Sequence, residues 1–324
     1  MPLQVSDLDN AIPLWDELTG AEARLINHSE NHTFLFCAPH GEAYCLRVHR
    51  PDYQSTANIE SELDWLEALH KQTDLIIPEP IGGSNGKLLQ NFSTAAGETH
   101  HAVLFHFIAG HEPTPESNLV ELFSVLGDYA ARLHEHAIGW KRPLAFERQA
   151  WTAEAILDPD GLWGDWRVAP GVTADIHAVL DRAQSLLRRR LADYGTGTDR
   201  YGLIHADMRL GNLLVDGDQV CLIDFDDCGL CWFGYDFAAA ISFHETHKAV
   251  PALKAAWLEA YQATRPLSAL DVEMLDSMVL LRRMALLAWI GSHIETGLAQ
   301  THVNGFAQGT ADLAQRYLRG PIWP

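Results

Sequence analysis

Long hydrophobic runs are absent from this sequence. No stretch of about 18 or more consecutive apolar residues occurs, and the start, Met1-Pro2-Leu3-Gln4-Val5-Ser6-Asp7, lacks the basic-then-apolar pattern of a secretory signal. Hydrophobic residues still make up 47% of the 324 residues, a proportion typical of a globular protein. We therefore expect a soluble, cytoplasmic protein without a membrane partner.

Basic residues are scarce. The chain has 23 Lys and Arg against 43 Asp and Glu, which gives a formal net charge of −20. Because nucleic-acid backbones select basic surfaces, we expect no nucleic-acid partner. The negative charge would attract a cationic substrate, but solubility alone also accounts for it, and we favour solubility.

Cysteine is rare as well. The five cysteines make no disulfide framework in a chain of this length. Cys228 and Cys231 have the spacing of a redox or half-zinc motif, but no second pair accompanies them. The segment His244-Glu245-Thr246-His247 is one residue short of the metalloprotease spacing. We therefore expect no metal site at either place.

One polar stretch stands out against this background. His205, Asp207 and Asn212 have the spacing His-x-Asp-x-x-x-x-Asn, and Asp224-Phe225 follows them. Between these positions, two short apolar runs flank Asp216-Gly217-Asp218, which predicts a tight hairpin. Since a hairpin holds its two ends close together, we expect Asp207, Asn212 and Asp224 to share one small site.

This set of side chains is suited to phosphoryl transfer from a nucleotide. One carboxylate, for which we select Asp207, orients or deprotonates the attacking hydroxyl. The amide oxygen of Asn212 and the carboxylate of Asp224 are oxygen ligands of the kind that Mg²⁺ takes. ATP and Mg²⁺ are therefore the cofactors that we predict, although the sequence does not separate ATP from GTP. The roles of Asp226 and Asp227, metal support or substrate contact, stay open.

The same spacing matches the catalytic loop and metal-binding Asp of kinases. Over residues 201–239 most strongly, the chain resembles the aminoglycoside phosphotransferase/choline kinase-like family, which includes type II homoserine kinases and bacterial stress-response kinases. The resemblance implies an α+β, bilobal protein kinase-like fold with a small antiparallel-sheet N-lobe and a larger, mainly helical C-lobe. It implies that residues 1–108 bind the nucleotide and that residues 109–324 carry catalysis and substrate binding.

Within the catalytic stretch, the resemblance assigns supporting roles to two further residues. His205 belongs to the catalytic motif, where we expect it to brace the loop by hydrogen bonds instead of transferring protons. Asp236 is expected to be structural, holding the same loop in place. An ordinary loop capped by His and Asp is the alternative that structural context has to exclude.

The N-terminal part has the pattern of a small antiparallel sheet. Residues 3–20 predict a helix or lead-in, and the segments 25–38 and 43–49 predict strands around the turn Pro39-His40-Gly41. By resemblance, this hairpin covers the nucleotide. Its tip, Ser29-Glu30-Asn31-His32, contains no Gly, so it lacks the Gly-rich loop of protein kinases. Asn31 is a candidate for approaching the phosphates, and a plain turn residue is the alternative.

Arg47 occupies the position where the family has a strand Lys that binds the α- and β-phosphates. Arg keeps a fixed charge and binds phosphate bidentately, so the role survives the change. A buried basic residue needs a partner, which we expect on the helix predicted over 55–70. Glu60 and Glu62 are the candidates, and we select Glu62; an ordinary solvated charge is the alternative for either.

The hinge to the second lobe is expected at the end of a strand over 101–108. By resemblance, the backbone here meets the adenine edge, and we assign Phe105, Phe107 and Ile108 to it. Amphipathic patterns then predict helices over 119–139 and 173–194, and the apolar segment 280–290 predicts a core helix. The intervening Trp-rich segment, with Asp227 and Glu245, fits a pocket for a cation or ordinary core packing; we favour packing.

We therefore predict an enzyme, an ATP-dependent phosphotransferase that moves the γ-phosphate to a hydroxyl of a small molecule. Amino alcohols, amino acids, sugars and aminoglycoside-like compounds are the acceptor classes. A stress-response-type protein Ser/Thr kinase and a weakly catalytic nucleotide-binding regulator are the alternatives. A regulated protein kinase is disfavoured, because Ala206 stands where Arg would bind an activation-loop phosphate and the segment from Asp224 to Asp236 is short. The oligomeric state is not predicted.

Overall fold

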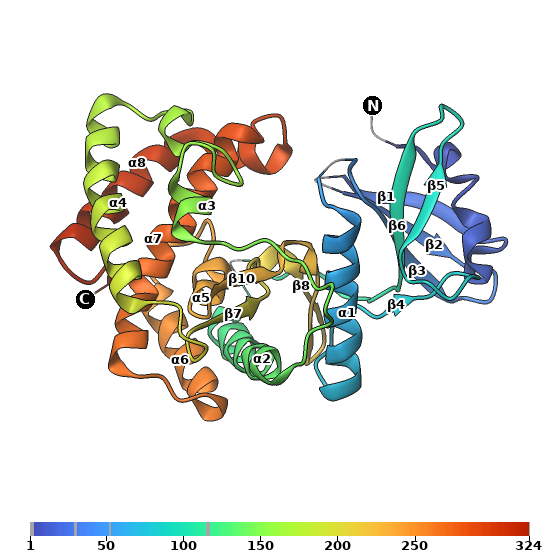
Figure 1. Cartoon of the computed structure of the whole chain (residues 1–324), viewed down its shortest axis with the longest axis horizontal. Helices are drawn as coiled ribbons and strands as arrows, with labels where there is room; N and C mark the ends of the chain where they lie inside the picture. The colour runs from blue at the N-terminus through green and yellow to red at the C-terminus, as the bar shows by residue number, and fades with distance from the viewer. Residues whose placement is uncertain (1–2, 29–30, 52, 115–116, 324) are drawn as a thin grey trace. The chain divides into compact units, whose positions relative to one another are not determined.

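The computed structural model of the chain describes residues 3–28, 31–51, 53–114 and 117–323 (Figure 1). Its backbone divides into two compact units. Unit 1 comprises Met1–His111, Lys141–Arg148 and Leu214–Asp226, and unit 2 comprises Glu112–Trp140, Gln149–Leu213 and Asp227–Pro324. Ser29 and Glu30 of the predicted hairpin tip lie outside the described residues. The lobe boundary predicted at residue 108 stays a prediction.

Unit 1 is built on an antiparallel sheet with the strand order β1-β2-β3-β6-β4, in which β5 also pairs with β6. The strands are β1 Glu22–His28, β2 His32–Cys37, β3 Ala43–Val48, β4 Pro80–Ile81, β5 Gln90–Ser93 and β6 Thr99–His106. The predicted hairpin around residues 39–41 is confirmed as β2 and β3, which pair from Cys37 opposite Ala43 to His32 opposite Val48. The same unit holds the hairpin of β8 Leu213–Asp216 and β9 Gln219–Leu222 from residue 214 onward.

Helix α1, Thr56–Gln72, is the one long helix of this unit among the described residues. It begins at Ser55, whose hydroxyl accepts a hydrogen bond from the Asn58 amide at 3.1 Å, as expected of an N-cap serine. The apolar face predicted from helical spacing is buried, and Leu63 is a typical member at 2% exposure. The buried face of α1, which includes Glu62 beside Leu63, is therefore the face that packs toward the sheet.

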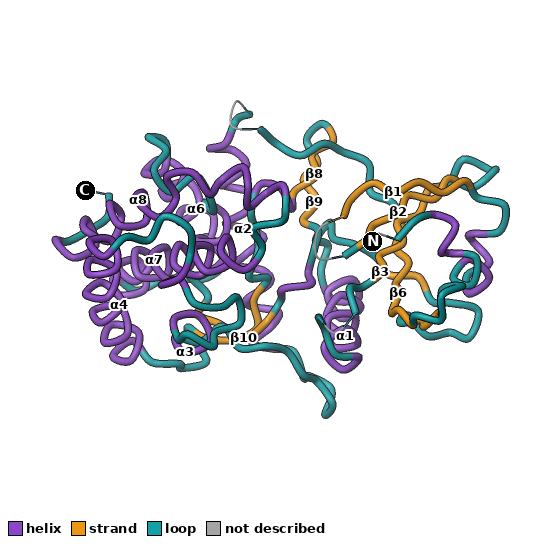
Figure 2. Tube along the Cα trace, turned by 90° about the horizontal axis from the view of Figure 1, so that it is seen from above, coloured by secondary structure: helices purple, strands orange, loops and turns teal. Residues whose placement is uncertain are grey.

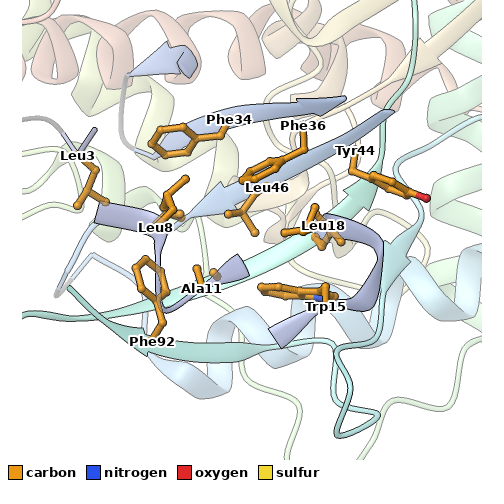
Figure 3. Close-up of a cluster of buried hydrophobic side chains, with 13 residues drawn as sticks. Leu3, Leu8, Ala11, Trp15, Leu18, Phe34, Phe36, Tyr44, Leu46 and Phe92 are labelled. Carbon is orange, nitrogen blue, oxygen red and sulfur yellow. The ribbon is translucent and has the colours of Figure 1, made fainter. Parts of the chain in front are cut away.

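The N-terminal segment forms three 3₁₀ turns: η1 Val5–Leu8, η2 Ile12–Leu14 and η3 Asp16–Leu18. It is therefore the lead-in of the prediction and not an α-helix. Pro13 lacks an amide hydrogen and would break a longer helix here. Leu8, Trp15 and Leu18 are fully buried and contribute to a cluster with Phe34 and Phe36 of β2 (Figure 3). The lead-in thus supplies the core beneath one face of the sheet.

Unit 2 is mainly helical, with one short two-stranded sheet (Figure 2). Strand β7, Tyr201–Ile204, pairs antiparallel with β10, Gly229–Trp232. The segment just before His205 and the segment after Asp227 therefore run side by side. The helices are α2 Leu119–Gly139, α3 Ala153–Leu157, α4 Ala174–Tyr194, α5 Tyr235–Ala240, α6 Val250–Thr264, α7 Ala269–Ser292 and α8 Gly297–Arg319. The described residues also form the short turns η4 Trp166–Val168, η5 Leu210–Asn212 and η6 Phe225–Asp227.

Close helix packing forms the core of this unit. Helix α2 packs against α6, and a Cβ at Gly127 would lie 2.3 Å from the carbonyl oxygen of Trp257, so only glycine fits there. Helix α7 packs against α5 and α8 and is buried from Met274 to Ile290, which confirms the predicted core helix. The sheet and helices together confirm the α+β class. Among the described residues, no helix combines the length and apolar character needed to cross a membrane.

Candidate active site

The loop after β7 is held in one conformation by a buried carboxylate. Asp236, in the first turn of α5, accepts hydrogen bonds from the backbone amides of Ala206 at 2.7 Å and His205 at 3.2 Å. His134 of α2 adds a third contact, Nε2 to Asp236 Oδ2 at 3.0 Å. These bonds hold Ala206 at φ +69°, a conformation that L residues rarely adopt. The bracing role that the resemblance implies for Asp236 is confirmed.

Asp207 lies at the end of this braced loop, 9% exposed. Its Oδ2 accepts a hydrogen bond from Asn212 Nδ2 at 2.7 Å. The same oxygen forms an ion pair with Arg209 Nε at 3.1 Å. Its Oδ1 pairs with the guanidinium of Arg282, a buried residue of α7. Two of the three residues that the sequence assigns to one site, Asp207 and Asn212, are therefore in direct contact.

These partners keep the Asp207 carboxyl ionised. Burial by itself raises its pKa, but the charges of Arg282 and Arg209, with His205 and the Arg282 hydrogen bond, hold the pKa below its usual range. An ionised carboxylate accepts a hydrogen bond from a substrate hydroxyl and, as the hydroxyl reacts, its proton. The site thus supplies a fixed acceptor at neutral pH.

Arg282 is a site residue that the sequence analysis missed. Its Nε donates to the hydroxyl of Ser242 at 3.0 Å, and its guanidinium lies 5.3 Å from the ring centre of Trp163. The surrounding segment was predicted only as apolar core. A charged pair, Arg282-Arg283, inside that apolar run was the available signal, because buried charges need partners.

Arg283 finds its partner elsewhere. It pairs with Glu245 at 2.6 Å and donates to Thr310 Oγ1 at 3.0 Å. Glu245 is therefore already engaged by a cation of the chain. Trp163 and Trp166 of the Trp-rich segment are 9% and 0% exposed, which agrees with the core-packing interpretation that we favoured.

His205 takes part in bracing. Its Nδ1 accepts the backbone amide of Asp207 at 3.2 Å, and the ring is fully buried. That contact agrees with the expected role as a brace of the loop.

Asn212 has its amide oriented by its neighbours. Its Nδ2 donates both to the backbone oxygen of Asp207, at 2.8 Å, and to the carboxylate. The amide oxygen consequently points away from Asp207 and accepts no hydrogen bond from a described residue. An amide oxygen so directed fits a hard cation such as Mg²⁺.

Asp224 belongs to unit 1, where it follows β9. It is exposed and adopts φ +65°, the second of three non-glycine residues with positive φ among the described residues. Two of the three, Ala206 and Asp224, therefore flank or occupy predicted site positions, and backbone strain gathers at functional sites. No group of three His, Cys, Asp or Glu side chains in the described part of the chain is placed to hold a metal alone.

Arg47 of β3 pairs with Glu62 of α1, the partner selected over Glu60. The distances from Arg47 NH2 to the two carboxylate oxygens are 2.9 and 2.8 Å, and both residues are buried. Burial lowers the pKa of Arg47, but Glu62, Asp226 and Asp224 raise it well above its usual range. Its buried Nε has no hydrogen-bond partner among the described residues. A buried donor without a partner marks a place for a ligand acceptor.

Asn31 is not a plain turn residue. Its Nδ2 donates to Asp226 Oδ2 at 2.9 Å, and its Oδ1 accepts the Arg50 amide at 3.3 Å. Burial raises the pKa of Asp226, whereas Arg47, His49, Arg148 and the Asn31 hydrogen bond bring it below its usual range. The start of β2 is thereby tied to the segment that carries Asp224.

The predicted adenine-binding segment follows β6. Phe105 is buried with its ring 5.2 Å from the Arg47 guanidinium, whereas Phe107 is exposed. The amides of Ile108, Ala109 and Gly110 donate no hydrogen bond to another described residue. The structure therefore leaves backbone donors available where the prediction needs them, and the assignment of Phe105, Phe107 and Ile108 stays a prediction.

Comparison with known proteins places this geometry in a wider group. A family model described as the phosphotransferase enzyme family matches residues 22–270. The solved structure of a microcompartment-associated aminopropanol kinase is 43% identical, covers 95% of this chain and 96% of that one, and has a TM-score of 0.87. An amicoumacin kinase solved with AMP-PNP, Ca²⁺ and Ami is 20% identical over 97% and 93% of the two chains, with a TM-score of 0.77. The second likeness shows the fold alone.

Curated relatives point the same way. Amicoumacin kinase of Bacillus subtilis (strain 168) is 27% identical over 221 residues, which is 67% of this chain and 61% of that protein. Homoserine kinase of Pseudomonas aeruginosa (strain LESB58) is 27% identical over 262 residues, 78% of this chain and 74% of that protein. The chain thus spans less than two thirds of the length of the first of these relatives. The predicted protein kinase-like fold is confirmed by the structural matches.

Proposed function

Since the chain belongs to the phosphotransferase enzyme family, we propose that it is an ATP-dependent kinase that phosphorylates the hydroxyl of a short amino alcohol. The carrying observation is the buried Asp207, ionised and held by Asn212, Arg209 and Arg282 at the end of a braced loop. The likeness at 43% identity to an aminopropanol kinase, over nearly all of both chains, supports the acceptor class.

The chain's residues divide the reaction between them. Asp207 accepts the hydrogen bond of the acceptor hydroxyl, orients its oxygen toward the γ-phosphorus and takes its proton as the new P–O bond forms. Arg47 binds the nucleotide phosphates, since its buried Nε has no partner in the described part of the chain and Glu62 fixes its guanidinium. The backbone of residues 108–110 receives the adenine edge.

Asn212 and Asp224 are the residues that would hold Mg²⁺. The amide oxygen of Asn212 fits this role by its orientation. Asn212 directly precedes the β8–β9 hairpin, and Asp224 follows it. Because the described residues hold no group of three His, Cys, Asp or Glu side chains placed for a metal, phosphate oxygens would complete the coordination. Bound Mg²⁺ would neutralise the charge on the transferred phosphate. Catalysis then depends mainly on positioning and charge.

An amino acid is the second acceptor class, supported by the homoserine kinase match over 78% of the chain. A protein acceptor has less support, because Ala206 provides no cation for an activation-loop phosphate.

A screen of ADP release tests the proposal. The acceptors are 1-amino-2-propanol, ethanolamine, choline, homoserine, spectinomycin and a generic protein substrate, each with ATP and Mg²⁺. We expect the highest kcat/KM with a short amino alcohol and at least about a 100-fold lower kcat for Asp207→Asn. Asp216→Asn, at the exposed end of β8, is the matched control and retains full activity. Phosphate transfer to protein alone, or an active Asp207→Asn enzyme, would refute the proposal.

A further inference from the structure

A line of buried polar side chains in unit 2 ends at the braced loop. It consists of Arg265, Tyr261, His134 and Asp236, whose exposed fractions are 7%, 1%, 0% and 0%. They come from the end of α6, from α2 and from the start of α5, and α2 packs against α6, α5 and β7 (Figure 1). Because burying polar groups costs free energy unless each finds a partner, the direction of every contact in this line matters.

The direction of these hydrogen bonds follows from the Asp236 end. Both oxygens of Asp236 already accept backbone amide hydrogens, from Ala206 at 2.7 Å and from His205 at 3.2 Å. A carboxylate only accepts, so His134 Nε2, which lies 3.0 Å from Asp236 Oδ2, carries a hydrogen. Burial lowers the pKa of His134 against the opposing hydrogen bond and charge of Asp236, so the ring is neutral and its Nδ1 is an acceptor.

Tyr261 therefore donates to the ring of His134. Its hydroxyl lies 2.9 Å from His134 Nδ1. Burial raises the pKa of Tyr261 above its usual range, against the charge and hydrogen bond of Arg265, so the hydroxyl keeps its hydrogen. The hydroxyl oxygen accepts a hydrogen bond from Arg265 Nη1. Each member of the line thus donates to the next, from the guanidinium to the carboxylate.

Arg265 is held at the far end of the line by contacts of its own. Its Nε donates to Glu135 Oε1 at 2.6 Å, and its Nη2 donates to the backbone oxygen of Asp199, just before β7, at 3.2 Å. The guanidinium also lies 4.6 Å from the ring centre of Phe233, whose ring stacks on His134. Arg265 consequently contacts the segment that enters β7, and the line of hydrogen bonds ends at the loop that leaves it.

The tautomer of His134 decides whether this line is complete. With its hydrogen on Nδ1 instead of Nε2, the ring would present a lone pair to the Asp236 carboxylate. It would also point its hydrogen at a Tyr261 oxygen that already accepts from Arg265, and the Tyr261 hydrogen would lose its acceptor. Leaving buried polar groups without partners costs free energy, so the donors at Tyr261 and Arg265 favour the form with hydrogen on Nε2.

From these observations we propose that Tyr261 and Arg265 are positioning residues of the loop that carries Asp207. They fix His134 as a donor to Asp236, and Asp236 holds the two loop amides. The inference rests on the proposed function for its kinetic consequence. A looser loop orients Asp207 less well toward the acceptor hydroxyl, so kcat falls while binding of ATP is unchanged.

Tyr261→Phe removes the hydroxyl and keeps the ring, and Tyr317→Phe is the matched control. Tyr317 of α8 is also 1% exposed, and its hydroxyl lies 2.8 Å from that of Ser277 in α7. Each variant loses one buried hydrogen bond, so we expect a similar fall in Tm, about 2 °C. Only Tyr261→Phe should lower kcat, about tenfold, with the KM for ATP within about twofold of wild type.

Two further measurements need no turnover. Hydrogen exchange of the His205 and Ala206 amides should be at least about fivefold faster in Tyr261→Phe than in wild type, and unchanged in Tyr317→Phe. In ¹⁵N spectra of the histidine rings, His134, identified by its absence from His134→Gln, should carry its hydrogen on Nε2. A wild type that phosphorylates no acceptor would refute the proposed function, and these two measurements would still decide the positioning role.

A double-mutant cycle tests whether Tyr261 acts through His134. Adding Tyr261→Phe to His134→Gln should lower kcat by less than about twofold further, and full additivity would contradict the line of hydrogen bonds. Arg265→Lys, which keeps a donor, should retain more activity than Arg265→Met. Should His134→Gln fail to fold, the two Tyr variants still decide. Hydrogen on Nδ1 of His134, equal loop exchange in Tyr261→Phe and Tyr317→Phe, or an unaltered kcat in Tyr261→Phe overturns the proposal.

Discussion

At the scale of single residues, Arg282 controls the state of Asp207. The guanidinium is 3% exposed, and it pairs with the carboxylate while Ser242 holds its Nε. A buried positive charge in direct contact with a carboxyl group stabilises the ionised form of that group. Arg282 is therefore a positioning residue that sets both the orientation and the pKa of the proposed base.

Replacing Arg282 by Met is expected to raise the pKa of Asp207, because burial then acts without its main opposing charge. The acidic limb of kcat/KM should move to higher pH by about one unit or more. Arg282→Lys keeps a charge and should move it less. A pH–rate profile of the Met variant that superimposes on wild type would show that Arg282 has no electrostatic role.

The same lowered pKa links stability to pH. A carboxyl group whose pKa is lower in the folded state contributes stability above its unfolded pKa, and this contribution is lost as the pH falls through the folded value. The free energy of unfolding of wild type, measured in urea, should therefore fall below about pH 4. That of Arg282→Met should fall less over the same pH range. At neutral pH the Met variant should be less stable by about 3 kcal/mol, since one partner of a buried pair is removed.

At the scale of elements, β3 and α1 are joined by one buried ion pair. Arg47 reaches Glu62 across the sheet–helix contact, and its pKa is raised by that partner among others. The pair fixes the guanidinium that we propose for the nucleotide phosphates.

Glu62→Gln should raise the KM for ATP about tenfold and reduce the free energy of unfolding by about 3 kcal/mol, because Arg47 keeps its charge without its main counterion. Steady-state kinetics and urea titration measure the two effects. Glu60→Gln is the matched control on the same helix, where Glu60 is exposed, and should behave as wild type. If Glu62→Gln and Glu60→Gln had the same KM for ATP and the same free energy of unfolding, the Arg47–Glu62 ion pair would have no role in nucleotide binding or stability.

A second link between elements runs through Asp236, which joins α5 and α2 to the loop after β7. Asp236→Asn has one acceptor oxygen fewer, so at least one of the amides of His205 and Ala206 or the His134 ring loses its partner. We expect kcat to fall about 100-fold, since the loop no longer positions Asp207, and stability to fall by about 2 kcal/mol.

Asp193→Asn, at an exposed position of α4, is the control for this loss. A normal kcat in Asp236→Asn, together with reduced stability, would make Asp236 a folding residue without influence on Asp207.

At the scale of the whole molecule, the proposed reaction requires a divalent cation. Excess EDTA should abolish ADP formation, and added Mg²⁺ should restore it, because Asn212 is neutral and Asp224 is acidic, so neither offsets the negative charge of the phosphates without the metal. Thermal denaturation provides a second measurement: AMP-PNP should raise the Tm more with Mg²⁺ than with EDTA, since ligands that bind the folded state stabilise it. Turnover that persists in EDTA would contradict the assignment of Asn212 and Asp224 as Mg²⁺ ligands.

The sequence by itself determined the local features of this protein. The hairpin, helix α1 and the catalytic spacing follow from turn residues, apolar periodicity and side-chain chemistry, all of which act over a few residues. Asp207 and Asn212 were predicted to share a site with Asp224 because a tight hairpin holds its two ends close together, and the contact of Asp207 with Asn212 at 2.7 Å agrees. For residues 3–20 the sequence left a helix and a lead-in open, and the structure has the lead-in, three 3₁₀ turns in a segment where Pro13 would break a longer helix.

Tertiary structure alone decided which distant residues complete the site. Arg282 lies 75 positions from Asp207, and its apolar surroundings predict only a buried helix. The Asn31–Asp226 contact depends in the same way on segments that meet only after folding. A buried charge or polar ring must find a partner, but the sequence does not specify which one. Partner choice is fixed by the packing of strands and helices, which brings together groups that no local pattern connects.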